Sequence, residues 1–406
     1  MNSNKFTTTY CFGYTILWQL YLLQGPLGLT TFAKFLIVIL LVYSLYKVID
    51  VNLRYKVPIF LKGVNLLLLM FTVYGIVYLI AGEDYIINSA SGIVKLVKWH
   101  YLKNIYSSLP TIYVYYDYAQ KGVLRKEKNV FALLIILLIS AIVGFFGYYA
   151  MVTEETGASF KYIDGLTNNM GYRFVPIMAL CFVVKKWRFP IICICMAFIV
   201  ASLKRGALVV GIVSFITYFY MLYCEATGLR RKAVVAFFVV AVVAGGYFGY
   251  DFYEKSEGMQ RRLEQTLEGN SSGRDELYTK ILEYYPKQES TLAMLIGNGA
   301  DSTVGLTGNY AHDDWLELLM NQGLLGIVVY MVFYIYWYRT LQVIKRKAPD
   351  EVKVAFGLLL LGSLVTSIFS MAYSSFGATS GIVIGMALTY YSNTKRITYG
   401  EHTLSN

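Results

Sequence analysis

The chain has 406 residues, of which 57% are hydrophobic and only 15% are charged, and its formal net charge is +11. A soluble domain cannot hide that much apolar surface, so the composition indicates a protein whose main solvent is the lipid bilayer. The basic residues fall in short clusters between apolar runs, which is a topology pattern, so the positive charge does not indicate binding to nucleic acid.

Apolar runs of roughly 17–25 residues mark helices that cross a membrane. We predict about twelve of them, and the expected fold class is therefore an all-α, polytopic membrane protein. The predicted spans are 12–29, 31–48, 58–81, 99–118, 129–150, 168–184, 189–203, 206–224, 233–250, 315–338, 353–372 and 377–392.

Clusters of Lys and Arg fill every even-numbered connection between these spans, and another follows the last span. The positive-inside rule then places both termini in the cytoplasm. We expect spans one to nine in residues 1–250, one long loop on the outer side at 251–314, and spans ten to twelve with a cytoplasmic tail in 315–406.

The long outer loop is acidic overall, and "RRLEQTLEGNSSGRDELYTKILEYYPKQ" predicts two short helices separated at "GNSSG". Ser272 is a candidate cap for the second helix. The sequence "GNGAD" at 297–301 resembles a phosphate-binding loop only loosely, because it lacks the GK[ST] ending. Turn geometry is the favoured interpretation of these glycines.

Several cations lie on the side predicted to face outward, contrary to the positive-inside rule. Lys204 and Arg205 occupy a very short connection in "ASLKRGALVV", and Arg173 opens the sixth span. An anionic ligand at the outer membrane face would explain such charges. Three more outward lysines are Lys95, Lys98 and Lys103. An alternative for those three is that they only extend to lipid phosphates.

The most polar cluster of the chain, "NYAHDDWLELLMNQGLLG" at 309–326, opens a hydrophobic helix. His312 could accept a proton from a hydroxyl there. A structural alternative is a helix-capping region, with Asp313 and Asp314 at the positive end of the helix. The two carboxylates could also suggest a metal site, but adjacent residues of a helix point in different directions, which disfavours it.

Arg274, in "SSGRDELY", and Arg205 are candidate ligands for phosphate. A guanidinium grips phosphate oxygens in a bidentate manner and keeps its charge at any relevant pH. For Arg274, a surface ion pair within the acidic loop is the alternative.

Three segments resemble the O-antigen ligase/polymerase family of bacterial membrane glycosyltransferases. They are "ASLKRGALVVGIV" (201–213), "SSGRDELYTKILEYYPKQESTLAMLIGNG" (271–299) and "YAHDDWLELLMNQGLLGIVVY" (310–330), and they occur in the family's order. The chain departs from the family at three positions: Lys204 replaces a usual serine, Tyr278 a common tryptophan, and Asp313 a common asparagine.

The resemblance implies an architecture similar to multi-span, lipid-dependent (GT-C-like) glycosyltransferases of the bacterial inner membrane, with a periplasmic active site. The donor would be a glycan on undecaprenyl diphosphate, transferred with inversion and without cofactor or metal. Arg205, Arg274 and His312 would be catalytic. The diphosphate would be bound by five cations: Arg205, Arg274, Lys204, Arg173 and Lys103. Asp313, Glu317 and Tyr278 would support them. Glu317 lies more than one helical turn beyond His312, so we expect it to brace a neighbouring helix.

Two reactions fit this resemblance. A polymerase joins one lipid-linked glycan to the acceptor sugar of another, and a ligase joins it to lipid A core or another terminal acceptor. Polymerase is the favoured function, with membrane lipids and a chain-length regulator as candidate partners. A polysaccharide flippase or transporter is less favoured, because a transporter should carry charged or broken helices at mid-membrane, and the predicted spans are nearly charge-free at their centres.

Overall fold

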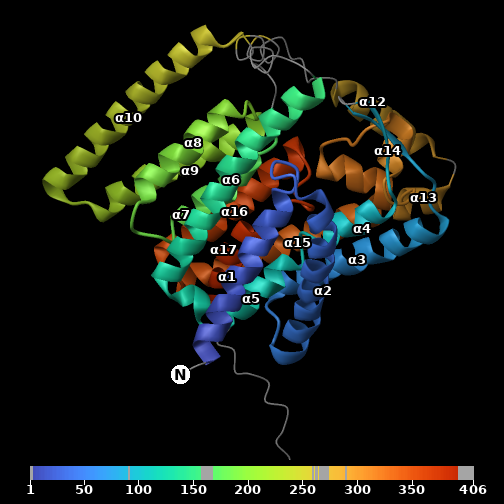
Figure 1. The fold of residues 1–406 in the computed structure, drawn as a ribbon, viewed down its shortest axis with the longest axis horizontal. Helices are drawn as coiled ribbons and strands as arrows, with labels where there is room; N and C mark the ends of the chain where they lie inside the picture. Colours follow the sequence, from blue (N-terminus) through green and yellow to red (C-terminus); the bar gives the residue numbers. More distant parts are fainter. Residues whose placement is uncertain are drawn as a thin grey trace, which may run out of the picture.

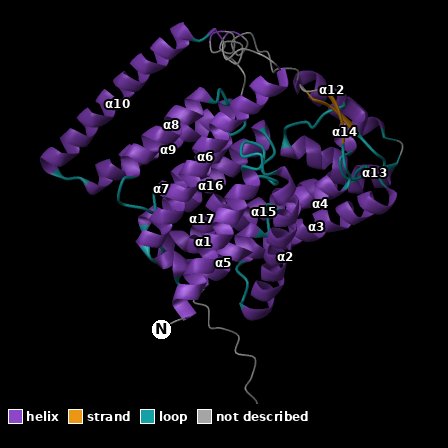
Figure 2. Cartoon of the chain, viewed as in Figure 1, coloured by secondary structure: helices purple, strands orange, loops and turns teal. Residues whose placement is uncertain are grey.

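The structure is a computed structural model that describes residues 3–89, 92–156, 168–257, 274–288 and 290–391, together with Gln260 and Glu264. These residues are helical apart from one two-stranded antiparallel hairpin (Figure 2). The elements are α1 Ser3–Leu22, α2 Thr30–Arg54, α3 Ile59–Ala81, β1 Ile86–Ser89, β2 Gly92–Lys95, α4 Trp99–Tyr106, α5 Thr111–Gln120, η1 Val123–Arg125, α6 Glu127–Thr156, α7 Gly171–Cys181, α8 Arg188–Ala201, α9 Arg205–Glu225, α10 Gly228–Lys255, α12 Arg274–Tyr284, η3 Tyr285–Lys287, α13 Thr291–Ile296, α14 Ser302–Thr307, α15 Asp314–Lys347, α16 Asp350–Phe369 and α17 Ala378–Tyr391.

Within the described residues, seven helices are long and apolar enough to cross a membrane, namely α2, α3, α6, α9, α10, α15 and α16. Three shorter apolar helices, α7, α8 and α17, pack with them. Multiple helices of this kind indicate an integral membrane protein. Figure 1 shows most of them as one bundle, from which α10 projects beside α9, and the helices of the polar segment, α12, α13 and α14, lie at the opposite end beside α3 and α4.

One predicted span is wrong as a continuous helix. Residues 99–118 form two short helices, α4 and α5, separated by the turn at 107–110. Pro110 lacks the N–H that a continuing helix would need, and it stands at the start of α5 instead. The first predicted span, 12–29, also differs, because α1 already ends at Leu22.

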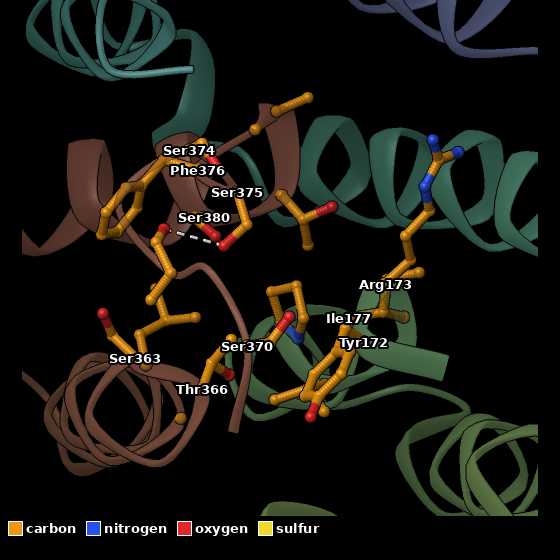
Figure 3. A pocket seen from close by; sticks show the side chains of 18 of the residues that line it. Tyr172, Arg173, Ile177, Ser363, Thr366, Ser370, Ser374, Ser375, Phe376 and Ser380 are labelled. Carbon is orange, nitrogen blue, oxygen red and sulfur yellow. Dashed lines mark hydrogen bonds between the residues drawn. The ribbon is translucent and has the colours of Figure 1, made fainter. Parts of the chain in front are cut away.

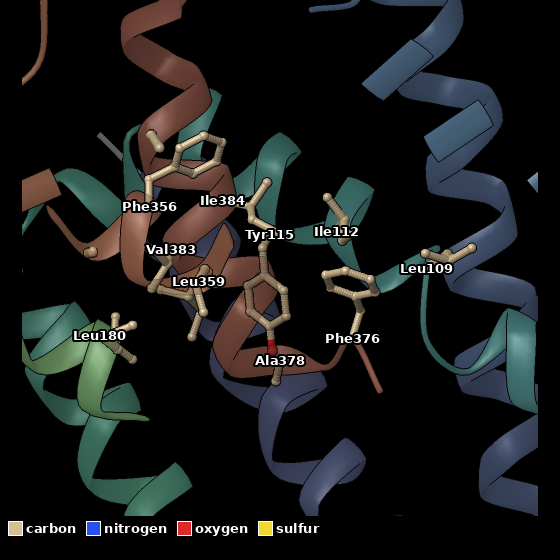
Figure 4. Packing of buried hydrophobic residues seen from close by; sticks show 14 of the residues in the cluster. Leu109, Ile112, Tyr115, Leu180, Phe356, Leu359, Phe376, Ala378, Val383 and Ile384 are labelled. Carbon is tan, nitrogen blue, oxygen red and sulfur yellow. The ribbon is translucent and has the colours of Figure 1, made fainter. Parts of the chain in front are cut away.

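The interrupted span places α5 in the middle of the bundle, where every residue from Thr111 to Ala119 is buried. Helix α17 crosses it closely because Gly381 and Gly385 present no side chain at the contact. A Cβ on Gly385 would lie 2.7 Å from the carbonyl oxygen of Tyr115. Figure 4 shows Tyr115 and Ile112 packed among the aliphatic residues of α16 and α17.

The C-terminal ends of α2 and α5 share a buried set of charges, which we call the α2–α5 charge network. Asp117 is fully buried, and its Oδ2 atom accepts from the Nζ atoms of Lys47 and Lys121, each at 2.7 Å. Asp50 also pairs with Lys47, at 3.2 Å. The hydroxyl of Tyr55 donates to the other oxygen of Asp117 at 3.3 Å. Each buried charge in this network therefore has partners, as burial requires.

The long helix α15 is kinked at Gly323, whose φ is 63° and ψ −156°. The kink exposes main-chain oxygens of α15 to the glycine-rich segment that precedes it in the sequence. The N–H groups of Asn298 and Gly299 donate to the carbonyls of Met320 and Asn321, each at 3.0 Å. A Cβ on Gly297 would lie 2.4 Å from the oxygen of Asn321. The "GNGAD" glycines therefore provide turn geometry and close backbone approach.

In the predicted outer loop, the structure describes the second of the two expected short helices, α12, which begins at Arg274. The first expected helix and its candidate cap Ser272 lie outside the described residues.

Candidate active site

His312 lies in the turn before α15 and has a left-handed backbone, with φ of 55°. That conformation is uncommon for a residue other than glycine, so neighbouring groups must hold it. Two carboxylates do so. Asp313 caps α15 by accepting from the N–H groups of Trp315 and Leu316 at 2.9 and 3.0 Å. Glu317 accepts from the N–H of Ala311 at 2.6 Å.

Glu317 acts as a brace for the histidine turn. Its side chain is fully buried, and the amide of Asn321 donates to it at 3.2 Å. Asn321 in turn accepts from the main chain and hydroxyl of Thr303 on α14, both at 3.0 Å. The carboxylate therefore fixes the turn on one side of His312 to α14 and α15, and it holds the main chain beside the imidazole through Ala311.

Arg274, at the start of α12, reaches the end of α16. Its Nη1 atom donates to the carbonyl oxygen of Phe369 at 3.0 Å. The same guanidinium lies beside the hydroxyl of Tyr278, whose pKa is raised by burial and by Asp313, while Arg274 opposes that rise. Its charge also acts on Tyr172 of α7 and on His312.

The turn between α8 and α9 carries the other two cations. Ser202 packs against α7 so closely that a Cβ on Gly171 would lie 2.2 Å from its hydroxyl oxygen. Leu203 then takes a left-handed φ of 55°, and Lys204 occupies the extended position just before α9. Arg205 is exposed at the first helical position. The next residue, Gly206, abuts Tyr172 and Phe369, so the turn borders the same groups that Arg274 meets.

The cations act directly on the histidine. Burial, and to a smaller extent the positive charges of Arg274 and Lys204, lower the pKa of His312 to about 4. The imidazole is therefore neutral at pH 7, which is the form that accepts a hydrogen bond or a proton. The structure brings together five predicted residues from separate parts of the sequence, which we call the histidine cluster: His312, Arg274, Lys204, Asp313 and Tyr278.

His312 also lines a cavity of about 490 Å³ that runs between α1, α6, α7, α15, α16 and α17. Arg173 and Tyr172 of α7 lie on its wall, and Figure 3 shows them with the hydroxyl-bearing residues of the opposite side. The Nη1 atom of Arg173 is buried and has no hydrogen-bond partner in the described part of the chain. The cavity has the size of a typical small-molecule site.

Sequence reasoning missed the wall opposite Arg173, which is the connection between α16 and α17 together with the first turn of α17. It reads "SMAYSSFGATSG" at 370–381, and all five of its Ser and Thr side chains line the cavity. These are Ser370, Ser374, Ser375, Thr379 and Ser380. A run of small hydroxyl residues between two apolar spans was the signal that could have revealed it.

Asp314 holds this connection in place, a role that the sequence did not reveal. Its fully buried carboxylate accepts from the N–H of Ala372 at 3.0 Å and from that of Tyr373 at 3.2 Å. The hydroxyl of Tyr330 donates to it as well. Asp314 begins the helix that follows His312, so one short segment positions both the imidazole and the hydroxyl-rich wall.

The three remaining predicted cations make contacts elsewhere. Lys95 pairs with Asp84 at 2.7 Å, Lys98 donates to the carbonyl of Gly82, and Lys103 lies over the ring of Trp99, 5.9 Å from its centroid. No described contact joins them to the histidine cluster. Across the described residues, no group of three or more His, Cys, Asp and Glu side chains is arranged to hold a metal ion.

Comparison with known proteins identifies the segment that carries the cluster. A family model described as O-antigen ligase matches residues 190–331. The match begins in α8 and ends in α15, so it includes Lys204, Arg205, Arg274 and His312. No curated protein matches the chain. Residues 190–331 are therefore an O-antigen ligase family domain, carried by a multi-pass helical membrane protein.

Proposed function

We propose that the protein is a surface polysaccharide polymerase. It transfers a glycan from undecaprenyl diphosphate to a sugar hydroxyl of another lipid-linked repeat unit, at the periplasmic face of the inner membrane. The observation that supports this most strongly is the convergence of Arg274 and Lys204 on His312, at the mouth of a cavity and within the O-antigen ligase domain. Transfer of lipid-linked glycans is the chemistry of that family.

The proposed reaction needs positive charge where the diphosphate leaves. Negative charge develops on the departing oxygen, and preorganised donors there lower the barrier by about 2.7–4 kcal/mol each. Arg274 and Arg205 supply these donors, and Lys204 adds charge. Within the described residues neither arginine forms an ion pair with a carboxylate, so both retain hydrogen-bonding capacity for an anion. Arg173 and Lys103 are further candidates for the same anion.

His312 acts on the acceptor. As a neutral imidazole it accepts a hydrogen bond from the attacking hydroxyl and orients it toward the anomeric carbon. Donor binding sharpens this role, because the diphosphate neutralises the two cations that lower the pKa of His312. The pKa then rises and the imidazole becomes a stronger base when the donor is in place. Direct displacement of the diphosphate inverts the anomeric centre and uses no metal.

Purified protein in lipid nanodiscs, supplied only with the lipid-linked repeat unit of its host, tests this function. A ladder of products without any second acceptor supports a polymerase. Transfer that appears only when lipid A core is added supports a ligase, the reaction after which the matching family is described. Absence of transfer to either acceptor contradicts both. His312→Asn and Arg205→Gln should each abolish the ladder while the protein still accumulates in the membrane.

A further inference from the structure

The cavity beneath His312 has hydrogen-bonding groups that the fold does not use. In the described part of the chain, the hydroxyls of Ser370, Ser374, Thr379 and Ser380 make no hydrogen bond, although all four residues line it. Trp337, another lining residue, is fully buried, and its Nε1 atom has no partner among the same residues. Figure 3 shows Ser374, Ser375 and Ser380 facing the cavity from one connection and Arg173 on the other side.

These groups are unsuited to a hydrocarbon. A polyprenyl chain filling the cavity would leave several donors and acceptors unsatisfied, and each such group is costly in a site without bulk water. A sugar, in contrast, carries hydroxyls that match them one for one. The rings of Trp337 and Phe376, whose centroids lie 5.8 Å apart, are almost fully buried, so recognition of a sugar rests on the hydroxyls.

The position of the cavity selects between the two sugars of the reaction. Of the residues proposed for the donor diphosphate, Arg205 and Arg274 begin α9 and α12 and do not line the cavity, whereas Arg173 lies on its wall. His312 both receives the charge of Arg274 and lines the cavity, so it lies between these helix starts and the cavity. The hydroxyl that His312 orients belongs to the acceptor, and the rest of that sugar must extend away from the donor.

We propose that the hydroxyl-rich connection between α16 and α17, with the first turn of α17, is the acceptor-sugar subsite, and that Ser374, Thr379 and Ser380 are its hydrogen-bonding residues. Asp314 is a positioning residue that fixes this subsite relative to His312 through the main chain of Ala372 and Tyr373. The proposal rests on the glycan transfer proposed above, and it adds which substrate the cavity recognises.

The test varies the concentration of a free acceptor at a fixed, low concentration of donor, because the lipid-linked repeat unit can itself occupy the acceptor subsite. The donor is the host's lipid-linked repeat unit, and the acceptor is the same oligosaccharide released from its lipid. Replacing Ser374 and Ser380 together by alanine removes two hydrogen bonds to sugar, so the KM for the free oligosaccharide should rise roughly tenfold or more. The affinity for undecaprenyl diphosphate without sugar should stay within about twofold. Ser214→Ala is the matched control, because that hydroxyl bonds within α9 to the carbonyl of Val210.

Calorimetry separates this inference from the proposed reaction. The free oligosaccharide should bind to the His312→Asn variant, and binding should be lost when Ser374→Ala and Ser380→Ala are added to it. Unchanged oligosaccharide binding and KM in the serine variants would overturn the subsite. A change that appears only in donor affinity, and that disappears with a short-prenyl donor, would assign the cavity to the lipid chain instead. Failure of wild-type transfer with intact oligosaccharide binding would contradict the proposed reaction alone.

Discussion

Two regions of the protein differ in whether their charged side chains pair with groups of opposite charge. In the α2–α5 charge network, Asp117 and Asp50 neutralise the buried Lys47, and Lys121 and Tyr55 complete the set. At the histidine cluster, Arg274 donates one hydrogen bond to the main-chain carbonyl of Phe369, and no described carboxylate pairs with it. The buried carboxylates beside the cluster, Glu317 and Asp314, accept hydrogen bonds from main-chain N–H groups instead. Charges that satisfy one another hold helices together, whereas cations without a carboxylate partner are available to an anionic substrate.

The largest expected effect is at His312. Replacement by asparagine should lower turnover by roughly 10²–10⁴-fold, because the acceptor hydroxyl loses its hydrogen-bond acceptor and base. Asparagine tolerates the left-handed backbone of this position, so folding should be preserved, whereas alanine adds strain. Turnover and the thermal unfolding temperature are measured on the same preparation. Near-normal turnover would remove the histidine from the mechanism.

The α2–α5 charge network should show the opposite behaviour. Asp117→Leu leaves the buried Lys47 and the partly exposed Lys121 without their main partner, which should cost about 3–5 kcal/mol of stability. Activity per folded molecule should be unchanged. Denaturation in detergent, combined with turnover normalised to folded protein, checks this. A variant that is stable but inactive would show that the network takes part in catalysis and would break the comparison between the two regions.

Arg274→Gln tests the histidine cluster, where we expect a loss of activity without a loss of stability. Turnover should fall roughly 10²–10³-fold through the loss of one donor to the leaving diphosphate, with little change in unfolding temperature. Lys280→Gln is the matched control, since it removes an exposed cation from the same helix. Equal losses in the two variants would mean that net charge, and not the position of Arg274, matters.

The smallest expected effect is on pH dependence. Because the pKa of His312 is lowered to about 4 in the free enzyme, kcat/KM should stay level from pH 7 to well below 6 and then fall as the imidazole becomes protonated. Removing the Arg274 charge should move this acid limb upward, but only partly, because burial is the larger cause. A wild-type limb near 6.5 would show that the imidazole is not held neutral by its surroundings.

Much of this organisation can be read from the sequence, and the exceptions have physical reasons. Apolar runs revealed the membrane helices, but hydropathy does not register the turn at Pro110 that divides α4 from α5. The motifs predicted His312, Arg274 and Lys204 as site residues, and the structure brings these three side chains near one another. Topology alone also drew attention to Lys103, yet its described contact is with Trp99.

Asp314 and the hydroxyl-rich wall were missed for a different reason. The carboxylate looked like part of a helix cap, since nothing in the sequence shows that residues 372 and 373 return to meet it. Such long-range main-chain contacts depend on how α16 and α17 fold back over α15. Serine and threonine are common at helix ends, so their gathering around one cavity became visible only in three dimensions.

The most direct test of the central claim is binding of undecaprenyl diphosphate without sugar to protein in nanodiscs. Arg274→Gln and Arg205→Gln should each weaken its affinity by about tenfold or more, as expected for a lost charge-assisted hydrogen bond. Lys280→Gln should bind like the wild type. Equal affinity in all four proteins would contradict the claim that these arginines, with His312, form the site of the lipid diphosphate.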